Sequence, residues 1–283
     1  MELKKHSYGK SNIRLTKVVR RAQRHKLFEI EADIELEGDF QRSYTHGDNA
    51  NCIATDSMKN TVYVLAKEHL FSDVEEFAYI LGEHFIGTYP QVTKVSVELR
   101  QANWQRIEVG GEPHDHAFVS GGQDERIARV TARRGAPIEW WGGLRNLRVL
   151  KTTNSQWHTF VDDRYRTLPD ARDRILATQI DADWRYVTSD CVFELHVAAI
   201  RKAILETFAN HASLGVQQTL LAMGEAALEA SDTIDRIDFT LPNLHRVPFN
   251  FEPFGLKFEN DIFIATDEPY GLIKGTVERE PRP

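Results

Sequence analysis

The stretch from Phe28 to Glu37, FEIEADIELE, carries the strictest pattern in the chain, because apolar and acidic residues alternate through it without a break. Successive side chains of a β-strand point to opposite faces of its sheet, so this pattern predicts a strand with one buried and one wet face. The preceding segment is also strand-like, and we predict a long hairpin over residues 11–37. Its tip would hold a basic cluster: Arg20, Arg21, Arg24, His25 and Lys26. We interpret this cluster as a solvated turn rather than a nucleic-acid patch, because the chain has a net charge of −7.

The pattern changes to helical spacing after the turn-rich residues 43–51. Thr55 and Asp56 open the first helical segment, and either is suited to cap a helix N-terminus. Ser72 and Glu75 open the second helical segment at the spacing of a capping box. The predicted elements that follow the hairpin are therefore helices at 55–69 and 72–89 and strands at 93–111 and 126–134.

The second half of the chain repeats this order of two strands, two helices and two strands. The predicted elements are strands at 146–153 and 181–187, helices at 191–212 and 216–230, and strands at 233–242 and 261–277. The periodicity is interrupted by Gly, Pro and two Trp residues in RRGAPIEWWGGLRN. We therefore predict a tandem duplication within an α+β fold, with domains at 1–138 and 139–283.

Composition excludes several classes of function and partner. The chain of 283 residues has a sequence pI near 5.9, so no general basic field is available to bind nucleic acid or an anionic membrane. Cys52 and Cys191 are too few for a disulfide framework or a cysteine metal site. The N-terminus lacks an apolar signal core, no run of 18 apolar residues occurs, and the chain ends in EREPRP. We expect a cytoplasmic protein.

An antiparallel sheet with paired helices on one face leaves its other face to be covered, and assembly into a closed barrel would cover it. At this point the motifs resemble those of the urate oxidase (uricase) family, whose members have the tunnelling fold, or T-fold. The similar stretches are YGKSNIRLTKV (8–18), GDNANCIATDSMKNTVYVLAK (47–67), LGEHFIGTY (81–89), GEPHDHAF (111–118), LKTTNSQWHTF (150–160), RDRILAT (172–178), VQQTLLAMGE (216–225), LPNLH (241–245) and GLIKGTV (271–277). They follow the family order from end to end.

The resemblance implies an enzyme that oxidises urate with dioxygen and water to 5-hydroxyisourate and hydrogen peroxide, without metal or organic cofactor. It also implies a homotetramer with active sites at subunit interfaces, in which Lys10 and His245 come from one subunit and Thr55 and Asp56 from its neighbour. The implied proton relay is Lys10, Thr55 and His245. The implied substrate contacts are Asp56, Trp157, Arg174, Val216, Gln217 and Asn243, with Asn243 holding dioxygen or water above the ring. Trp157 stands where most relatives have Phe.

These residue types suit the chemistry. Urate is a planar, electron-rich anion, and Arg174 offers a planar fork of donors to an anion. The Gln217 amide offers both a donor and an acceptor to the edge of a purine. A lysine has a reference pKa of about 10.4, so a lysine base needs a lowered pKa, and the Thr55 hydroxyl is able to relay its proton.

Each residue taken alone has a plainer interpretation: a solvated lysine, a helix cap, a surface arginine, a structural glutamine or histidine, or a core tryptophan. Only their joint occurrence in family order favours the catalytic interpretation. His114 and His116 lie two apart, as a metal-binding pair would on a strand, but further ligands are not evident. The remaining alternatives are a catalytically inactive purine- or pterin-binding T-fold protein and a pterin enzyme of the same fold.

Overall fold

The computed structural model describes residues 2–280, which fall into two compact units. The first unit runs to Gly143 and also takes in Arg185–Glu194, and the second comprises Leu144–Trp184 and the chain from Leu195 onward. The first contains β1 (Tyr8–Val19), β2 (Lys26–Gly38), α1 (Gln41–His46), α2 (Thr55–Glu68), α3 (Val74–Thr88), β3 (Val92–Val109) and β4 (Glu112–Arg133). Its strands pair in the order β1-β2-β3-β4, all antiparallel.

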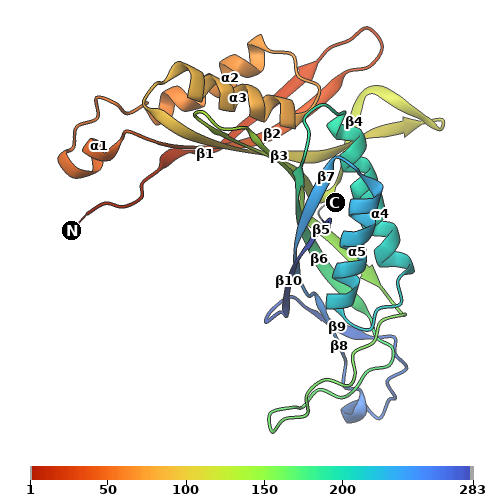
Figure 1. Ribbon diagram of the computed structural model, residues 1–283. Coiled ribbons are helices and arrows are strands. Elements are labelled where there is room, and N and C mark those ends of the chain that lie inside the picture. The colour runs from red at the N-terminus through yellow and green to blue at the C-terminus, as the bar shows by residue number, and fades with distance from the viewer. Residues whose placement is uncertain (1, 281–283) are drawn as a thin grey trace. The chain divides into compact units, whose positions relative to one another are not determined.

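The remaining elements repeat that order except that they lack a counterpart of α1 and contain an insertion before the last strand. They are β5 (Glu139–Lys151), β6 (Leu176–Tyr186), α4 (Phe193–Asn210), α5 (Val216–Ala230), β7 (Ile234–Pro242), β8 (His245–Pro248), the short 3₁₀ helix η1 (Glu252–Phe254), β9 (Phe263–Thr266) and β10 (Leu272–Glu278). The strand order is β5-β6-β7-β10, and β8 and β9 form a separate hairpin. In each unit a pair of long helices covers one face of the antiparallel strands, which confirms the predicted α+β class (Figure 1).

The alternating stretch forms β2 as predicted, and its apolar side chains lie in the core of the first unit. Phe28 is 1% exposed and Leu36 is 0% exposed, and both belong to one cluster with Met58 of α2 and Phe77 of α3. At about 25 cal/mol per Å² of buried apolar area, such side chains contribute the main favourable term in folding. The hairpin is therefore held by the helices that pack on its apolar face.

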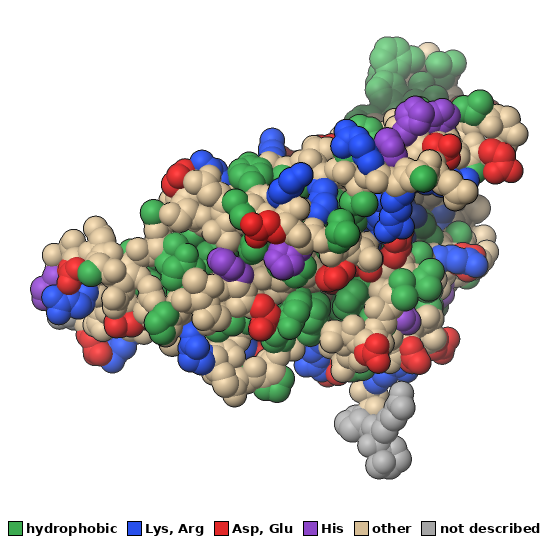
Figure 2. Space-filling model, turned by 90° about the horizontal axis from the view of Figure 1, so that it is seen from above, with side chains coloured by type: hydrophobic (Ala, Val, Ile, Leu, Met, Phe, Trp, Pro, Cys, Tyr) green, Lys and Arg blue, Asp and Glu red, His purple; other side chains and the backbone are tan. Residues whose placement is uncertain are grey.

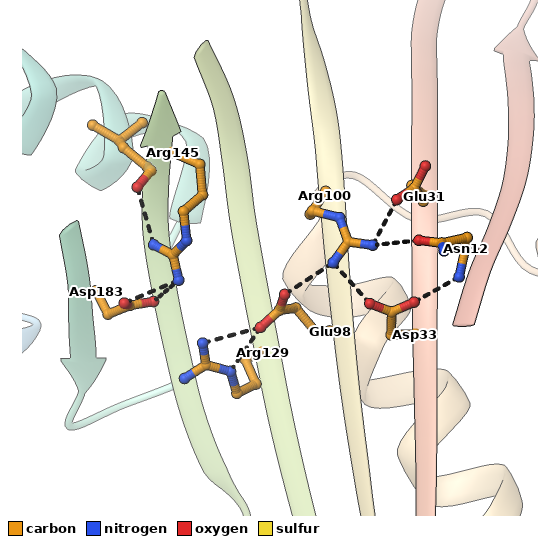
Figure 3. Close-up of polar contacts among 9 residues, drawn as sticks. Asn12, Glu31, Asp33, Glu98, Arg100, Arg129, Arg145 and Asp183 are labelled. Atoms are coloured by element: carbon orange, nitrogen blue, oxygen red, sulfur yellow. Dashed lines mark hydrogen bonds and ion pairs between the residues drawn. The ribbon is translucent and has the colours of Figure 1, made fainter. Parts of the chain in front are cut away.

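The opposite face of the same strands carries a network of charged side chains (Figure 3). The guanidinium of Arg100 binds Glu31 at 2.6 Å, Asp33 at 2.7 Å and Glu98 at 3.1 Å. Arg129 binds the same Glu98 at 3.0 Å. A hollow on this face, lined by Arg100, Glu31 and their neighbours, contains none of the predicted site residues. This face of the strands is therefore polar, and its charged side chains form ion pairs with one another.

Both predicted helix caps differ from the structure. Ala54 is the N-cap of α2, so Thr55 and Asp56 are its first helical residues and neither caps it. The N-terminus of α3 has no side-chain cap. The carboxylate of Glu75 binds Arg126 at 2.5 Å instead, and the backbone N–H of Ser72 donates to Glu76 at 2.7 Å. Glu75, which the local spacing predicts to cap the helix, instead forms a buried ion pair with a distant strand.

Two further differences concern element boundaries. The short helix α1 overlaps the start of the turn-rich residues 43–51, and β5 includes Trp140 and Trp141, where the sequence predicts an interruption. Trp140 stacks on Tyr79 with ring centroids 5.3 Å apart, so burial against α3 supports an extended backbone there. None of the helices within residues 2–280 is long and apolar enough to cross a membrane.

Equivalent side-chain contacts occur within each of the two units, in addition to the shared order of elements. The Nζ atom of Lys17 on β1 donates to the carbonyls of Ala66 and His69 at the end of α2, both at 2.6 Å. The Nζ atom of Lys151 on β5 donates to the carbonyls of Phe208 and His211 at the end of α4, at 3.3 and 2.5 Å. The last carbonyls of a helix have no partner within it, and each lysine supplies donors at the same place in its unit.

A second shared contact follows the last strand of each unit. Arg134, after β4, donates to the carbonyls of Ile86 and Tyr89 at the end of α3 and to that of Val92, the first residue of β3. Arg279, after β10, donates to those of Leu228, Ser231 and Ile234 at the end of α5. A third shared contact is a left-handed asparagine, Asn12 or Asn146, whose N–H donates to an aspartate of the next strand. These contacts give a residue-by-residue correspondence between the units.

Candidate functional site

The second unit contains six of the predicted site residues, and two of them, Trp157 and Arg174, lie in the segment between β5 and β6. Trp157 and Ala171 exchange two backbone hydrogen bonds of 2.8 Å, which closes residues 157–171 into a loop. The N–H of Arg174 donates to Ser155 at 2.9 Å, and that of Gln156 donates to Ser213 at 2.8 Å. The loop is thereby tied to the turn before α5, which brings Trp157 and Arg174 to the start of that helix.

Trp157 lies between an aromatic ring and a glycine. Phe160 stacks on it with centroids 5.5 Å apart and planes inclined by 14°. A Cβ atom built on Gly215 would lie 3.1 Å from the indole, so glycine allows the backbone before α5 to approach the ring closely. The guanidinium carbon of Arg174 is 5.8 Å from the indole centroid. The sequence identified Trp157 but missed Phe160, the last residue of the same motif, although its aromatic character was the available signal.

Two of the predicted site residues each bury a polar side-chain atom without a partner. The Nε of Arg174 and the Oδ1 of Asn243 make no hydrogen bond within the described residues 2–280. Burial also lowers the pKa of Arg174 from its usual value. A buried donor or acceptor left unpaired costs about 1–3 kcal/mol, which a ligand that pairs it recovers. Arg174, which alone would be interpreted as a surface charge, is instead a partly buried cation that presents an unused donor.

Val216 and Gln217 are the first two residues of α5. The N-cap residue is Gly215, which supplies no side-chain cap. The first backbone N–H groups of this helix therefore lack a side-chain acceptor, and such groups favour an anion. Val216 is 4% exposed and packs in the core, whereas the Gln217 side chain is exposed. The backbone at this helix start and the Gln217 amide are both available to a planar anion beside Arg174.

Asn243 and His245 follow β7 and are held by the chain around Gly271. The N–H of Asn243 donates to Gly271 at 2.9 Å, and the N–H of Gly271 lies 3.4 Å from the Nε2 of His245. His245 opens β8 and pairs with Thr266 of β9. Residues 263–266 of β9 thus support the strand that carries His245.

The correspondence between the units explains why the second unit has room beside Asn243 where the first unit has a side chain. Gln217 precedes Leu228 by the same number of residues as Glu75 precedes Ile86, so Gln217 corresponds to Glu75. In the same way Gly271 precedes Arg279 as Arg126 precedes Arg134, so Gly271 corresponds to Arg126. In the first unit the Arg126 guanidinium fills this position and binds Glu75. In the second unit a Cβ atom on Gly271 would meet only Asn243 at 3.4 Å and Ile273 at 4.0 Å. The missing side chain leaves room beside the Asn243 amide.

Lys10, Thr55 and Asp56 lie together in the first unit. Lys10 is on β1, and Thr55 and Asp56 begin α2, which packs on β1. Asp56 binds Lys59 at 2.6 Å, and Lys59 does most to hold the Asp56 pKa below its usual value, with a smaller contribution from the Lys10 ammonium. The fold of one unit thus brings the charges of Lys10 and Asp56 close within a single chain, whereas the family resemblance implies that they come from different subunits.

The histidines of GEPHDHAF lie at the start of β4. The rings of His114 and His116 are 4.6 Å apart, and the N–H of His116 lies 3.3 Å from the Nδ1 of His114. The N–H of His25 in the β1–β2 turn donates to Asp115 at 3.0 Å. Over residues 2–280, no group of three or more His, Cys, Asp or Glu side chains could hold a metal ion. The contacts of these histidines join two hairpin tips.

Comparison with known proteins gives one consistent family. A family model described as Uricase matches residues 6–131 and 142–274. The Uricase of Arthrobacter globiformis is 41% identical over 278 residues, covering 98% of this chain and 90% of that protein. The Uricase of Arabidopsis thaliana is 35% identical and covers 96% of this chain and 94% of its own. The crystal structure of the Arthrobacter globiformis protein superposes with a TM-score of 0.93 at 40% identity, covering 100% of this chain and 96% of that one.

Proposed function

Because the chain belongs to the uricase family, it is an oxidoreductase that oxidises urate, and we propose that its second unit holds the urate ring while its first unit supplies the base. The fold is accordingly a T-fold, and we propose that its tandem domains are residues 1–138 and 139–283. The observation that carries the proposed site is the pair of buried, unpartnered atoms Arg174 Nε and Asn243 Oδ1, with Arg174 lying beside the aromatic ring of Trp157.

The second unit supplies complementary contacts to each part of the substrate. The Trp157 indole, backed by Phe160, stacks on the flat face of the purine. Arg174 donates to the anionic edge, together with the backbone N–H groups of Val216 and Gln217. The Gln217 amide pairs with the neighbouring edge of the ring. Asn243 holds dioxygen or water above it, in the room that Gly271 leaves.

The first unit supplies two members of the proton relay, Lys10 and Thr55, and the second unit supplies His245. Lys10 is the base, and the Thr55 hydroxyl passes the proton from urate or water to it, with His245 as the third member. Asp56 stands on the substrate side of Thr55. Deprotonated urate gives two electrons to dioxygen, and addition of water then yields 5-hydroxyisourate and hydrogen peroxide. Because urate itself supplies the electrons, this reaction needs no metal or organic cofactor.

The two groups of residues meet through assembly of a homotetramer. In each unit the helices cover one face of the strands, and we propose that assembly into a closed barrel encloses the other face, which carries the charged network of Arg100. We place each active site where the first unit of one copy meets the second unit of another. On the face in Figure 2 acidic and basic side chains are interspersed, which suits a small anionic substrate better than nucleic acid. Since Cys52 and Cys191 form no disulfide, we place the enzyme in the cytoplasm.

The test is the decay of urate ultraviolet absorbance with parallel peroxide detection, after exhaustive dialysis against a chelator. Undiminished turnover with equimolar peroxide is expected. Binding of urate without turnover would instead support the catalytically inactive purine- or pterin-binding alternative. Loss of turnover on chelation, restored by one metal ion, would reject the cofactor-free reaction and make His114 and His116 candidate metal ligands.

A further inference from the structure

Tyr8 connects the strand that carries Lys10 to the chain segment that leads into Thr55. The backbone N–H of Ile53 donates to the Tyr8 hydroxyl at 2.7 Å, and that hydroxyl donates to the Ile53 carbonyl at 3.2 Å. The phenol ring packs edge-on against Phe40, with centroids 4.8 Å apart. One hydroxyl thus satisfies both backbone groups of a residue that is 7% exposed and lies two positions before Thr55.

The phenol is able to make both bonds only while it is neutral. Burial raises the pKa of Tyr8 to about 12, with a smaller contribution from neighbouring Cys52. The hydroxyl therefore keeps its proton throughout the neutral and mildly alkaline range, and it donates and accepts at once. The connection between β1 and the start of α2 does not loosen in the range where a lysine relay would be measured.

The backbone around Lys10 is fixed on both sides. A Cβ atom on the preceding residue, Gly9, would lie 1.8 Å from the carbonyl oxygen of Ile34, so only glycine permits β1 to lie this close to β2. After Lys10 the strand register shifts, and Asn12 takes a φ of 57° while its N–H donates to Asp33 at 2.7 Å. Lys10 is therefore presented from a rigid segment, and Tyr8 lies at one end of it.

We propose that Tyr8 is a positioning residue for the proton relay, and that its hydroxyl sets the Thr55–Asp56 end of α2 at a defined distance from Lys10. This inference rests on the roles proposed above for Lys10 and Thr55. Tyr8 acts through the backbone of Ile53 and takes no part in the proton transfer. Misplacement of a relay group by about 1 Å is enough to slow a reaction by about a hundredfold.

The experiment compares Tyr8→Phe with a matched variant, Tyr63→Phe. Tyr63 also joins the same two elements, because its hydroxyl donates from α2 to the Arg14 carbonyl on β1 at 2.9 Å, but it does so further along the helix. Both substitutions remove one hydroxyl and keep the ring. For Tyr8→Phe we expect kcat to fall by about ten- to a hundredfold with KM for urate changed less than threefold, and the pH profile of kcat to move. For Tyr63→Phe we expect parent values of kcat and an unmoved pH profile.

The outcomes separate this inference from the function on which it rests. Parent-like kcat and pH profile in Tyr8→Phe, while Lys10→Met and Thr55→Ala are inactive, would overturn the positioning role and leave the relay standing. Equal losses of kcat in Tyr8→Phe and Tyr63→Phe that follow their losses of Tm would also overturn it, because both hydroxyls would then be structural. Parent-like kcat in Lys10→Met would instead reject the proposed relay itself.

Discussion

Arg174 is the single side chain whose surroundings are most clearly completed by a bound anion, since its Nε is buried and lacks a partner within residues 2–280. We expect Arg174→Lys to raise KM for urate at least about tenfold with little change in kcat. An ammonium keeps the charge but cannot reproduce the paired, planar contacts of a guanidinium. Steady-state urate oxidation over a range of substrate concentrations measures both constants.

Arg172→Lys is the matched control for that substitution, because Arg172 lies in the same segment and is exposed. It should leave KM at the parent value. If the two variants give the same KM, Arg174 does not bind urate, and the anion is bound elsewhere.

Trp157 tests the stacking surface. Trp157→Phe should keep activity within about tenfold of the parent, because both rings stack on a purine and Phe160 still supports the smaller ring. Trp157→Ala should raise KM, since the flat surface is lost. Titration of urate binding under anaerobic conditions separates affinity from turnover. An alanine variant that binds urate as tightly as the parent would show that Trp157 is not the stacking residue.

At the residue scale, the motifs predicted which residues belong to the site but not how the neighbouring residues pack around them. Phe160 and Gly271 stand within quoted motifs, yet nothing in their spacing says that one backs the indole while the other leaves room beside Asn243. The role of Gly271 arises when β10 is placed beside the end of β7, which is a contact between segments far apart in sequence.

At the scale of elements, the lysine contacts at the helix ends make a stability prediction. Lys17→Met and Lys151→Met should each lower the free energy of unfolding by about 1–2 kcal/mol, because each removes donors from two terminal carbonyls while keeping an apolar stem. Chemical denaturation measures the loss. Lys257→Met is the control at an exposed position and should change stability little. A loss in only one of the two variants would contradict the equivalence of these contacts in the two units.

Local periodicity was a good guide to elements where one face is buried. The hairpin was predicted from alternation alone, and the second helix of the second half was predicted at the residues of α5, Val216–Ala230. Capping was predicted poorly, because Glu75 binds Arg126, which lies 51 residues away, rather than the start of its own helix. A buried charge needs its partner more than a helix end needs a cap that water can replace.

At the scale of the whole molecule, the division of site residues between the two units predicts which inactive variants complement each other. Lys10 and Thr55 belong to the first unit, and Arg174 belongs to the second. If each site joins the first unit of one copy to the second unit of another, Lys10→Met and Arg174→Ala lie on opposite sides of it. A mixed pair of subunits then has one site with both lesions and one site with none.

Co-expression of Lys10→Met with Arg174→Ala should therefore restore about a quarter of the parent activity, since about half of randomly formed pairs are mixed and each keeps one of two sites. Co-expression of Lys10→Met with Thr55→Ala should restore none, because both lesions lie in the first unit and every site carries one of them. The measurement is steady-state urate oxidation by tag-separated mixed oligomers, verified by mass spectrometry, beside each variant alone. Recovery only in the second combination would return Lys10 and Thr55 to different subunits. Absence of recovery in both would mean that each active site is built from a single chain, and the assembly proposed here would have to be given up.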